Sequence, residues 1–271
     1  MNRIDACIQQ MQQQQRCLLS PYITAGDPIL GSTVAVMHGL VAGGANILEI
    51  GIPFSDPMAE GPVIQAAMER SLAQGTTLQD VFQTIEQFRQ QNNTTPIILM
   101  GYLNPIEFYG YERFAKEAHR VGVDGTILVD LPPEESATVK EIWQKNNLYP
   151  IYLCSPTTTA QRMQRIDAHA KGYLYYVSIK GVTGSNALDI KSLQQQYLQR
   201  KEATKHPLLV GFGIKDPQMA AAVSQFADGV IVGAALIECL KKCYEEHGDA
   251  VASAQQFMRA MRDAMDNKSE R

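Results

Sequence analysis

The sequence has few of the features that place a protein in a membrane or outside the cell. Its longest apolar runs, such as "VIVGAALI", are far shorter than the roughly 20 residues that cross a bilayer. The first residues, "MNRIDACIQQ", lack the apolar core of a signal peptide. Five scattered cysteines do not form a disulfide framework and fit a reducing compartment. We therefore expect a cytoplasmic protein.

An excess of charge of either sign is also lacking. The 271-residue chain has a formal net charge of −4, which gives no sign of a surface for nucleic acid or anionic membranes. Hydrophobic residues make up 45% of the chain and charged residues 19%, as in an ordinary globular protein. No linker or shift in composition divides the sequence. We therefore expect a single domain over residues 1–271.

Eight short apolar runs alternate with helical patterns, and continuous apolarity is typical of parallel strands that are covered on both faces. The expected strands are 18–24, 46–52, 96–102, 126–131, 149–155, 173–179, 207–213 and 229–235. The expected helices are 33–40, 78–88, 111–121, 134–144, 159–169, 190–199, 217–226 and 236–244, with an extra N-terminal helix whose apolar face is Ile4, Ile8 and Met11. This alternation predicts an α/β fold, a (β/α)8 TIM barrel, with a doubly wound open sheet as the alternative.

In such a barrel, the residues that follow each strand form the active face. Three late loops there contain glycine: "KGVTGSNA", "GFGIKDP" and "VGAAL". Glycine lets backbone N–H groups approach a ligand closely, and barrels frequently bind phosphate after their last strands. At any one loop, glycines that merely turn the chain are the alternative. The three loops together favour a phosphate site.

Glu49 stands among apolar residues of the second expected strand, "NILEIGI". Because side chains alternate along a strand, Glu49 faces the barrel interior if Leu48 and Ile50 face the helices. Scarce polar partners there would raise its pKa, which suits a general acid–base. A structural carboxylate paired to a tyrosine is an equally weighted alternative. Glu60 follows on the proline-rich loop "PFSDPMAEGP", which is too apolar for a plain solvent loop.

Several segments, taken in order, resemble the alpha subunit of tryptophan synthase. They are "SPYITAGDP", "EIGIPFSDPMAEGPVIQ", "ILMGYLNP", "GTILVDLPPEE", "SPTT", "YYVSIKGVTG", "VGFGI" and "ADGVIVGAAL". The resemblance implies a (β/α)8 barrel that cleaves indole-3-glycerol phosphate to indole and glyceraldehyde 3-phosphate in a retro-aldol reaction, without cofactor or metal. It also implies a beta subunit that carries pyridoxal phosphate and consumes the indole, in an α2β2 assembly.

The resemblance implies roles for particular residues of this chain. Glu49 is the catalytic acid–base, and Glu60 stands where the family most often has the Asp that pairs with the indole nitrogen. The expected substrate-binding residues are Tyr22, Tyr102, Tyr175 and Thr183. The expected phosphate-binding residues are Gly184, Phe212, Gly213, Gly233 and Ala234, and the expected partner interface is Pro53, Asp56 and Pro57. Ala234 replaces a frequent Ser of the family, but its backbone N–H remains.

Two carboxyl groups in different environments suit this chemistry. Protonation of indole C3 makes an indolenine with positive character at the ring nitrogen. One carboxyl group then moves protons, and an ionised one stabilises the charge. Glu49, among apolar walls, suits the first role, and Glu60, on the loop, suits the second.

Other functions are weighed against this one. A Schiff-base aldolase would use Lys180, a carbohydrate hydrolase would use Glu49 and Glu60 as its acid pair, and an inactive barrel would serve only as a subunit. A zinc site is weighed for three residues spaced i, i+4 and i+8 on one helix, although such cysteines are more often packing residues: Cys239, Cys243 and His247.

Overall fold

The computed structural model describes residues 1–178, 189–211 and 213–267. Nine strands lie in these ranges, and all of their pairings are parallel. They are β1 (Leu18–Thr24), β2 (Leu48–Gly51), β3 (Ile97–Gly101), β4 (Gly125–Leu128), β5 (Tyr149–Pro150), β6 (Leu153–Cys154), β7 (Leu174–Val177), β8 (Leu208–Gly211) and β9 (Gly229–Val232).

The strands close into a barrel. Their order is β5-β4-β3-β2-β1-β9-β8-β7-β6, so the two edges of the sheet are β5 and β6. These two pieces follow each other within the segment 149–154, which pairs with β4 at its start and with β7 at its end. They correspond to the single expected strand 149–155. The prediction of an eight-stranded TIM barrel is therefore confirmed, and the open sheet is wrong.

Twelve helices accompany the strands in the described ranges. They are α1 (Arg3–Gln13), α2 (Thr33–Ala42), α3 (Pro62–Ala73), α4 (Leu78–Arg89), α5 (Leu103–Tyr109), α6 (Tyr111–Val121), α7 (Ala137–Lys145), α8 (Ala160–His169), α9 (Ile190–Lys201), α10 (Pro217–Ser224), α11 (Ala234–Glu245) and α12 (Ala250–Asp266). Three of them, α3, α5 and α12, come in addition to the helices expected from the sequence. None of the helices in the described ranges is both long and apolar enough to cross a membrane.

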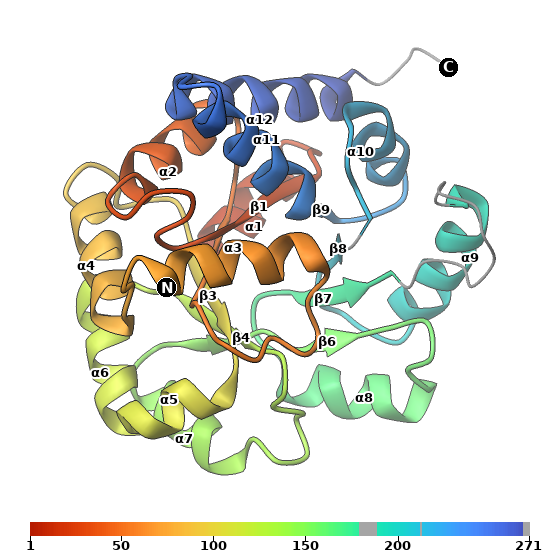
Figure 1. Ribbon diagram of the computed structural model, residues 1–271. Coiled ribbons are helices and arrows are strands. Elements are labelled where there is room, and N and C mark those ends of the chain that lie inside the picture. Colours follow the sequence, from red (N-terminus) through yellow and green to blue (C-terminus); the bar gives the residue numbers. More distant parts are fainter. Residues whose placement is uncertain (179–188, 212, 268–271) are drawn as a thin grey trace.

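The helices form a ring around the strands (Figure 1). The alternation of side chains along the strands separates two buried layers. Outward side chains such as Leu48 and Ile50 pack against the helices. Inward side chains such as Ile98, Leu209 and Ile231 fill the barrel. Each strand therefore contributes to both layers, which explains why the strand sequences are apolar almost without interruption.

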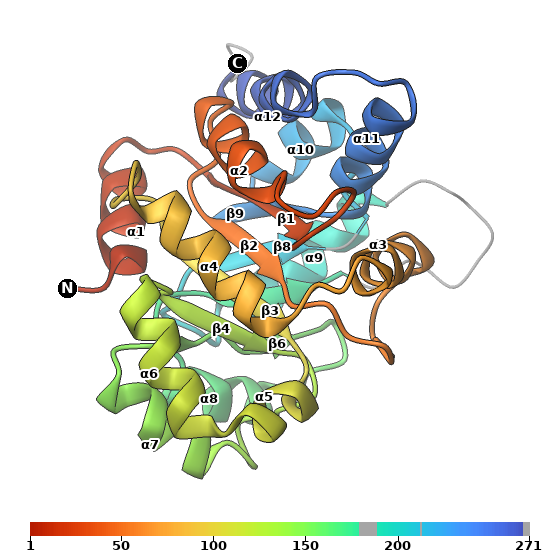
Figure 2. The same cartoon turned by 60° about the vertical axis from the view of Figure 1, so that its left-hand side comes forward.

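The two ends of the barrel differ. Figure 2 shows α1 at one end and α3 at the other. The apolar face of α1 joins the inner layer through Ile4, Ile8 and Met11, so this helix closes the end at which the strands begin. Arg3 fixes α1 there, since its guanidinium donates to Asp124 just before β4 at 2.9 Å. The opposite end, where the strands finish, is left for a ligand.

Candidate active site

Glu49 lies inside the barrel, as the alternation of β2 predicts. Its side chain is fully buried, and the two oxygens of the carboxyl group have different surroundings. Oε1 accepts hydrogen bonds from the Tyr173 hydroxyl at 3.0 Å and from the Ser20 hydroxyl at 3.1 Å. Oε2 is buried and has no partner in the described part of the chain. The alternative of a carboxylate paired to a tyrosine is thus true of one oxygen only.

The surroundings of Glu49 favour its protonated form. Burial raises the pKa of Glu49 from 4.5 to about 8, because a carboxylate loses its hydration there. The Tyr173 and Ser20 hydroxyls oppose this rise, since they donate to the ionised form, and the charge of Glu60 adds to it. At neutral pH, Glu49 therefore holds a proton that it could give to a substrate.

The rings of two tyrosines, Tyr22 and Tyr175, pack over glycines of the neighbouring strands. Tyr22 of β1 pairs in register with Glu49, and its hydroxyl would lie 2.1 Å from a Cβ atom at Gly51. The Tyr175 hydroxyl of β7 would lie 2.3 Å from a Cβ atom at Gly211. Both rings therefore need glycine beside them. Burial raises the pKa of both tyrosines, and the nearby carboxyl groups of Glu49 and Glu60 raise it further, so the phenols stay neutral.

Glu60 lies on the loop between β2 and α3, and this loop is held in two places. The backbone N–H of Ala59 donates to the Tyr102 hydroxyl at 3.0 Å, and the ring of Phe54 packs on Tyr102 with centroids 5.3 Å apart. The side-chain amide of Gln65 in α3 donates to the Glu60 carbonyl at 2.8 Å. The predicted pocket residue Tyr102 thus supports the loop that bears the second acid.

The carboxyl group of Glu60 is half-buried, and burial raises its pKa from 4.5 to about 7. Glu60 therefore ionises before Glu49 as the pH rises, which gives the two acids different protonation states near neutrality. The order agrees with the roles expected for them. Glu60 is less firmly ionised, however, than a loop position suggests from sequence alone, because its carboxyl group is partly removed from water.

The expected phosphate loops are described in part. Gly213 has a φ of +85°, which favours glycine at this position. Gly233 is the N-cap of α11, which has no side-chain cap and no acidic residue in its first turn, so the first N–H groups of the helix, from Ala234 on, suit an anion. Thr183, Gly184, Phe212 and the alternative nucleophile Lys180 lie outside the described residues.

The expected partner loop differs in exposure along its length. Asp56 is exposed and Pro57 is half-buried, whereas Pro53 is buried within the chain itself. Met58, next to Pro57, is 84% exposed, and Phe108 of α5 is 95% exposed.

The structure adds two residues that the sequence did not single out, Ser20 and Tyr173. Each stands two positions before a tyrosine that was predicted, Tyr22 and Tyr175, and so faces the same side of its strand. Alternation could therefore have placed both side chains inside the barrel. It could not have placed them at Glu49, because the relative heights of residues on different strands depend on the stagger of the barrel.

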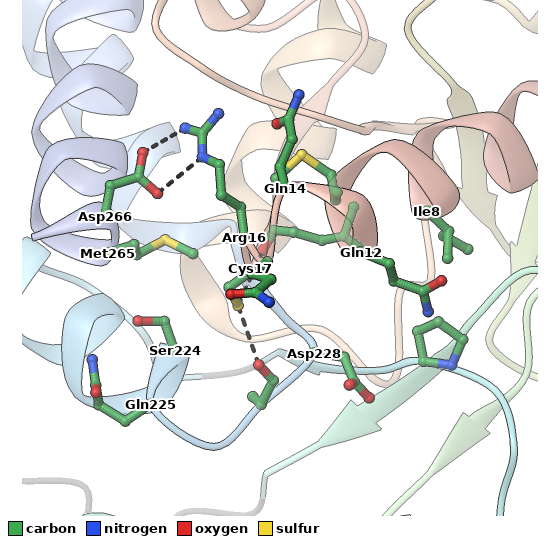
Figure 3. A pocket seen from close by; sticks show the side chains of 15 residues that line it. Ile8, Gln12, Gln14, Arg16, Cys17, Ser224, Gln225, Asp228, Met265 and Asp266 are labelled. Carbon is green, nitrogen blue, oxygen red and sulfur yellow. Dashed lines mark hydrogen bonds and ion pairs between the residues drawn. The ribbon is translucent and has the colours of Figure 1, made fainter. Parts of the chain in front are cut away.

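A cavity of about 520 Å³ opens at the other end of the barrel (Figure 3). It lies beside residues that precede strands, including Pro207 and Asp228. Its cation Arg16 is paired with Asp266, and burial raises the pKa of the Cys17 thiol to about 12. Neither side chain is thus poised for chemistry, and we place the reaction at the Glu49 end.

The zinc alternative finds no support in the described ranges, where no three His, Cys, Asp or Glu side chains gather closely enough to hold a metal ion. Cys243 is buried instead, and the Ser253 hydroxyl donates to its sulfur at 3.1 Å.

Comparisons with known proteins agree with this geometry. The family model described as "Tryptophan synthase alpha chain" matches residues 8–266. A tryptophan synthase alpha chain of Legionella pneumophila (strain Corby) is 60% identical over 98% of both chains. One of Marinobacter nauticus is 47% identical over 98% of this chain and 99% of its own. The crystal structure of tryptophan synthase subunit alpha from Legionella pneumophila str. Paris superposes with a TM-score of 0.94 at 57% identity, covering 98% of this chain and 99% of that one.

Proposed function

The chain belongs to the tryptophan synthase alpha chain family, and we propose that it acts through two carboxyl groups, Glu49 as the proton carrier and Glu60 as the fixed negative charge. The protein is a carbon–carbon lyase that cleaves indole-3-glycerol phosphate to indole and glyceraldehyde 3-phosphate. This confirms the activity expected from the sequence and sets aside the hydrolase, the Schiff-base aldolase and the inactive barrel.

In the proposed reaction the carboxyl group of Glu49 acts twice, first as an acid and then as a base. The carboxyl group of Glu49 protonates C3 of the indole ring, which gives an indolenine with positive character at nitrogen. Glu49, now ionised, accepts the proton of the hydroxyl on the adjacent glycerol carbon. The electrons of the O–H bond form the aldehyde C=O, the C3–C3′ bond breaks, and its electrons restore the indole. Glu49 finishes protonated, as it began, but with the proton of the hydroxyl in place of the one that it gave to C3, and the ionised Glu60 stabilises the ring N–H in between.

The observation that carries this assignment is the bare Oε2 of Glu49. A buried carboxyl oxygen without a partner is costly, and a fold gains nothing from it. An acid whose pKa burial raises to about 8, with one oxygen unoccupied, is instead suited to general acid–base catalysis near neutral pH.

Replacement of Glu49 by Gln tests the assignment. Glu49→Gln keeps the shape and should retain substrate binding, but turnover should fall by roughly 10²-fold or more, the range of general acid–base catalysis. Indole release by the purified chain measures this. Glu69→Gln, which alters an exposed acid of α3, is the matched control and should leave the rate unchanged. Near-normal turnover in Glu49→Gln would remove Glu49 from the mechanism.

We propose that the substrate phosphate is bound by backbone N–H groups of the late glycine loops. Gly213 and Gly233, together with the first turn of α11 at Ala234, support this site, because an uncapped helix start attracts an anion. Gly184 and Phe212 complete the proposed phosphate contacts, and Thr183 joins Tyr22, Tyr102 and Tyr175 around the rest of the substrate.

The family implies a tryptophan synthase beta subunit as partner, and we propose an α2β2 assembly in which that subunit carries pyridoxal phosphate. We place the contact on the loop of Pro53, Asp56 and Pro57, extended by two exposed apolar side chains at the same end of the barrel, Met58 and Phe108. Docking there would give the partner direct access to the indole, an apolar product that otherwise escapes.

We also propose a cytoplasmic location. All five cysteines are free thiols, as a reducing compartment would keep them.

A further inference from the structure

Ser20 is, like Glu49, a polar residue in the mostly apolar layer inside the barrel. It lies in the middle of β1, is fully buried, and pairs in register with Ile231 of β9. The next inward-facing residues of its own strand, Leu18 and Tyr22, belong to the inner apolar layer. A hydroxyl in such surroundings is costly unless it is hydrogen-bonded. The bond that the structure shows for it is the one to Glu49.

The two donors to Glu49 approach from the same direction. Ser20 precedes Tyr22, which pairs in register with Glu49, and Tyr173 precedes Tyr175 on β7. Parallel strands run from the closed end of the barrel to its active end, so each donor lies one inward-facing position deeper than the tyrosine that follows it. Both donors hold Oε1. Oε2 is the oxygen left for the substrate.

We propose that Ser20 is a positioning residue for the lyase reaction: its hydroxyl, together with that of Tyr173, holds Oε1 of Glu49 toward the floor of the barrel, so that Oε2 is the oxygen that exchanges the proton with the substrate. The inference rests on the proposed role of Glu49. It assigns different tasks to the two oxygens, because an anchored carboxyl group cannot rotate to present either one.

Ser20 also acts on the affinity of Glu49 for its proton. A hydroxyl that donates to a carboxylate favours the ionised form, so Ser20 lowers a pKa that burial raises. The other titratable groups that face Glu49 are Tyr22 of β1, Tyr173 just before β7, Tyr175 of β7, and Glu60 of the loop. From β3, Glu49 is paired with the apolar Ile98. Ser20→Ala takes away one donor to Glu49 without adding or removing a charge.

The test is Ser20→Ala, measured by indole release from indole-3-glycerol phosphate over a range of pH. We expect kcat to fall roughly tenfold with KM within about twofold, because the carboxyl group loses its orientation while the binding contacts stay. The alkaline limb of the kcat/KM profile, which reports ionisation of Glu49 in the free enzyme, should move up by roughly one pH unit, the size of one hydrogen bond to a charged group. Ser20→Thr, which restores a hydroxyl, should return the limb toward the parent position.

Two controls separate positioning from packing. Ser136→Ala removes another buried serine hydroxyl that is bonded to a tyrosine, here Tyr152 at 2.9 Å, but lies outside the barrel. It should leave the pH profile unchanged even if it lowers the melting temperature. If Ser20→Ala is too unstable to assay, Ser20→Cys, of similar shape and with a weak S–H donor, is read by the same criteria.

The variant Glu49→Gln distinguishes the two possible failures. If Glu49→Gln is inactive but Ser20→Ala has the parent rate and pH profile, the positioning role of Ser20 is wrong and that of Glu49 stands. If Glu49→Gln is itself active, the proposed function of Glu49 has failed. In the double variant, Ser20→Ala should cause no further loss beyond Glu49→Gln, since its effect passes through the carboxyl group.

Discussion

Replacement of Glu49 by Gln should stabilise the protein at alkaline pH, and the size of the effect follows from the burial of the carboxyl group. In the unfolded chain, Glu49 ionises near 4.5, whereas burial raises its pKa in the folded protein to about 8. Between these two values the folded protein retains a proton that the unfolded chain releases. The stability of the parent therefore falls as the pH rises through this window.

The magnitude is large on the scale of a folded domain. Each pH unit within the window costs about 1.4 kcal/mol, so the whole rise from 4.5 to about 8 corresponds to about 5 kcal/mol of unfolding free energy. Domains typically unfold at a cost of about 5–15 kcal/mol. The contribution of Glu49 is fully present below pH 4.5 and lost once the pH has passed about 8. Gln cannot ionise, so the Glu49→Gln variant does not lose stability in this way as the pH rises.

Urea unfolding followed by circular dichroism at several pH values tests this linkage. Parent and Glu49→Gln should have similar stability near pH 4.5, and the variant should gain on the parent with each unit above it. The difference should level off above about pH 8. A difference that stays constant from pH 5 to pH 9 would show that Glu49 is already ionised in the folded protein at neutral pH, and the reasoning from burial would be refuted.

Three further predictions concern the rest of the site. Glu60→Gln should lower turnover by roughly 10²-fold, since an amide cannot stabilise the charged ring, and should remove the acidic limb of the kcat/KM profile near pH 7. Glu60→Asp should stay within about tenfold of the parent, and equal activity of the parent and the Gln variant would exclude Glu60 from catalysis. Gly213→Val should raise KM for the phosphorylated substrate by roughly tenfold or more. The control Gly75→Val, at a second glycine of positive φ with open space around it, should affect stability alone, and equal KM values in the two variants would contradict a phosphate site at Gly213. Phe108→Asp should weaken binding of the beta subunit by roughly tenfold or more, measured by gel filtration and titration, without changing the rate of the isolated chain. The control Tyr244→Asp, at the far end of α11, should bind the beta subunit normally, and unchanged binding by Phe108→Asp would remove α5 from the interface.

The type and number of the barrel elements could be predicted from the sequence, but their ends could not. Residues 229–235 are apolar throughout, yet β9 ends at Val232 and α11 begins at Ala234, because an apolar run can continue from a buried strand into the buried face of a helix. The helix α3 was missed because it begins at Pro62, directly after the proline-rich loop. Proline is favoured in the first turn of a helix, so the signal was present.

The candidate site, too, could be predicted from the sequence only in part. Alternation along β2 was sufficient to turn Glu49 inward, since Leu48 and Ile50 on either side need the helix-facing layer. The partners of Glu49 were beyond reach, because Tyr173 is 124 positions away in the chain and the height at which it meets β2 is set by the stagger of the closed barrel. The raised pKa of Glu60 was equally hidden, since it depends on how far the folded structure buries the carboxyl group.

The conflict between stability and activity at Glu49 is itself evidence for function. Local pattern, burial and core packing agree along most of the barrel strands, as they do in sequences that specify one structure. Glu49 departs from that agreement: it is an acid in a layer of apolar residues, with one oxygen anchored by Ser20 and Tyr173 and the other left bare. A purely structural carboxyl group would be expected to have both oxygens satisfied, and a purely structural position would be filled by an apolar side chain. An acid that is held firmly and yet left incomplete is best explained by a substrate that supplies the missing partner.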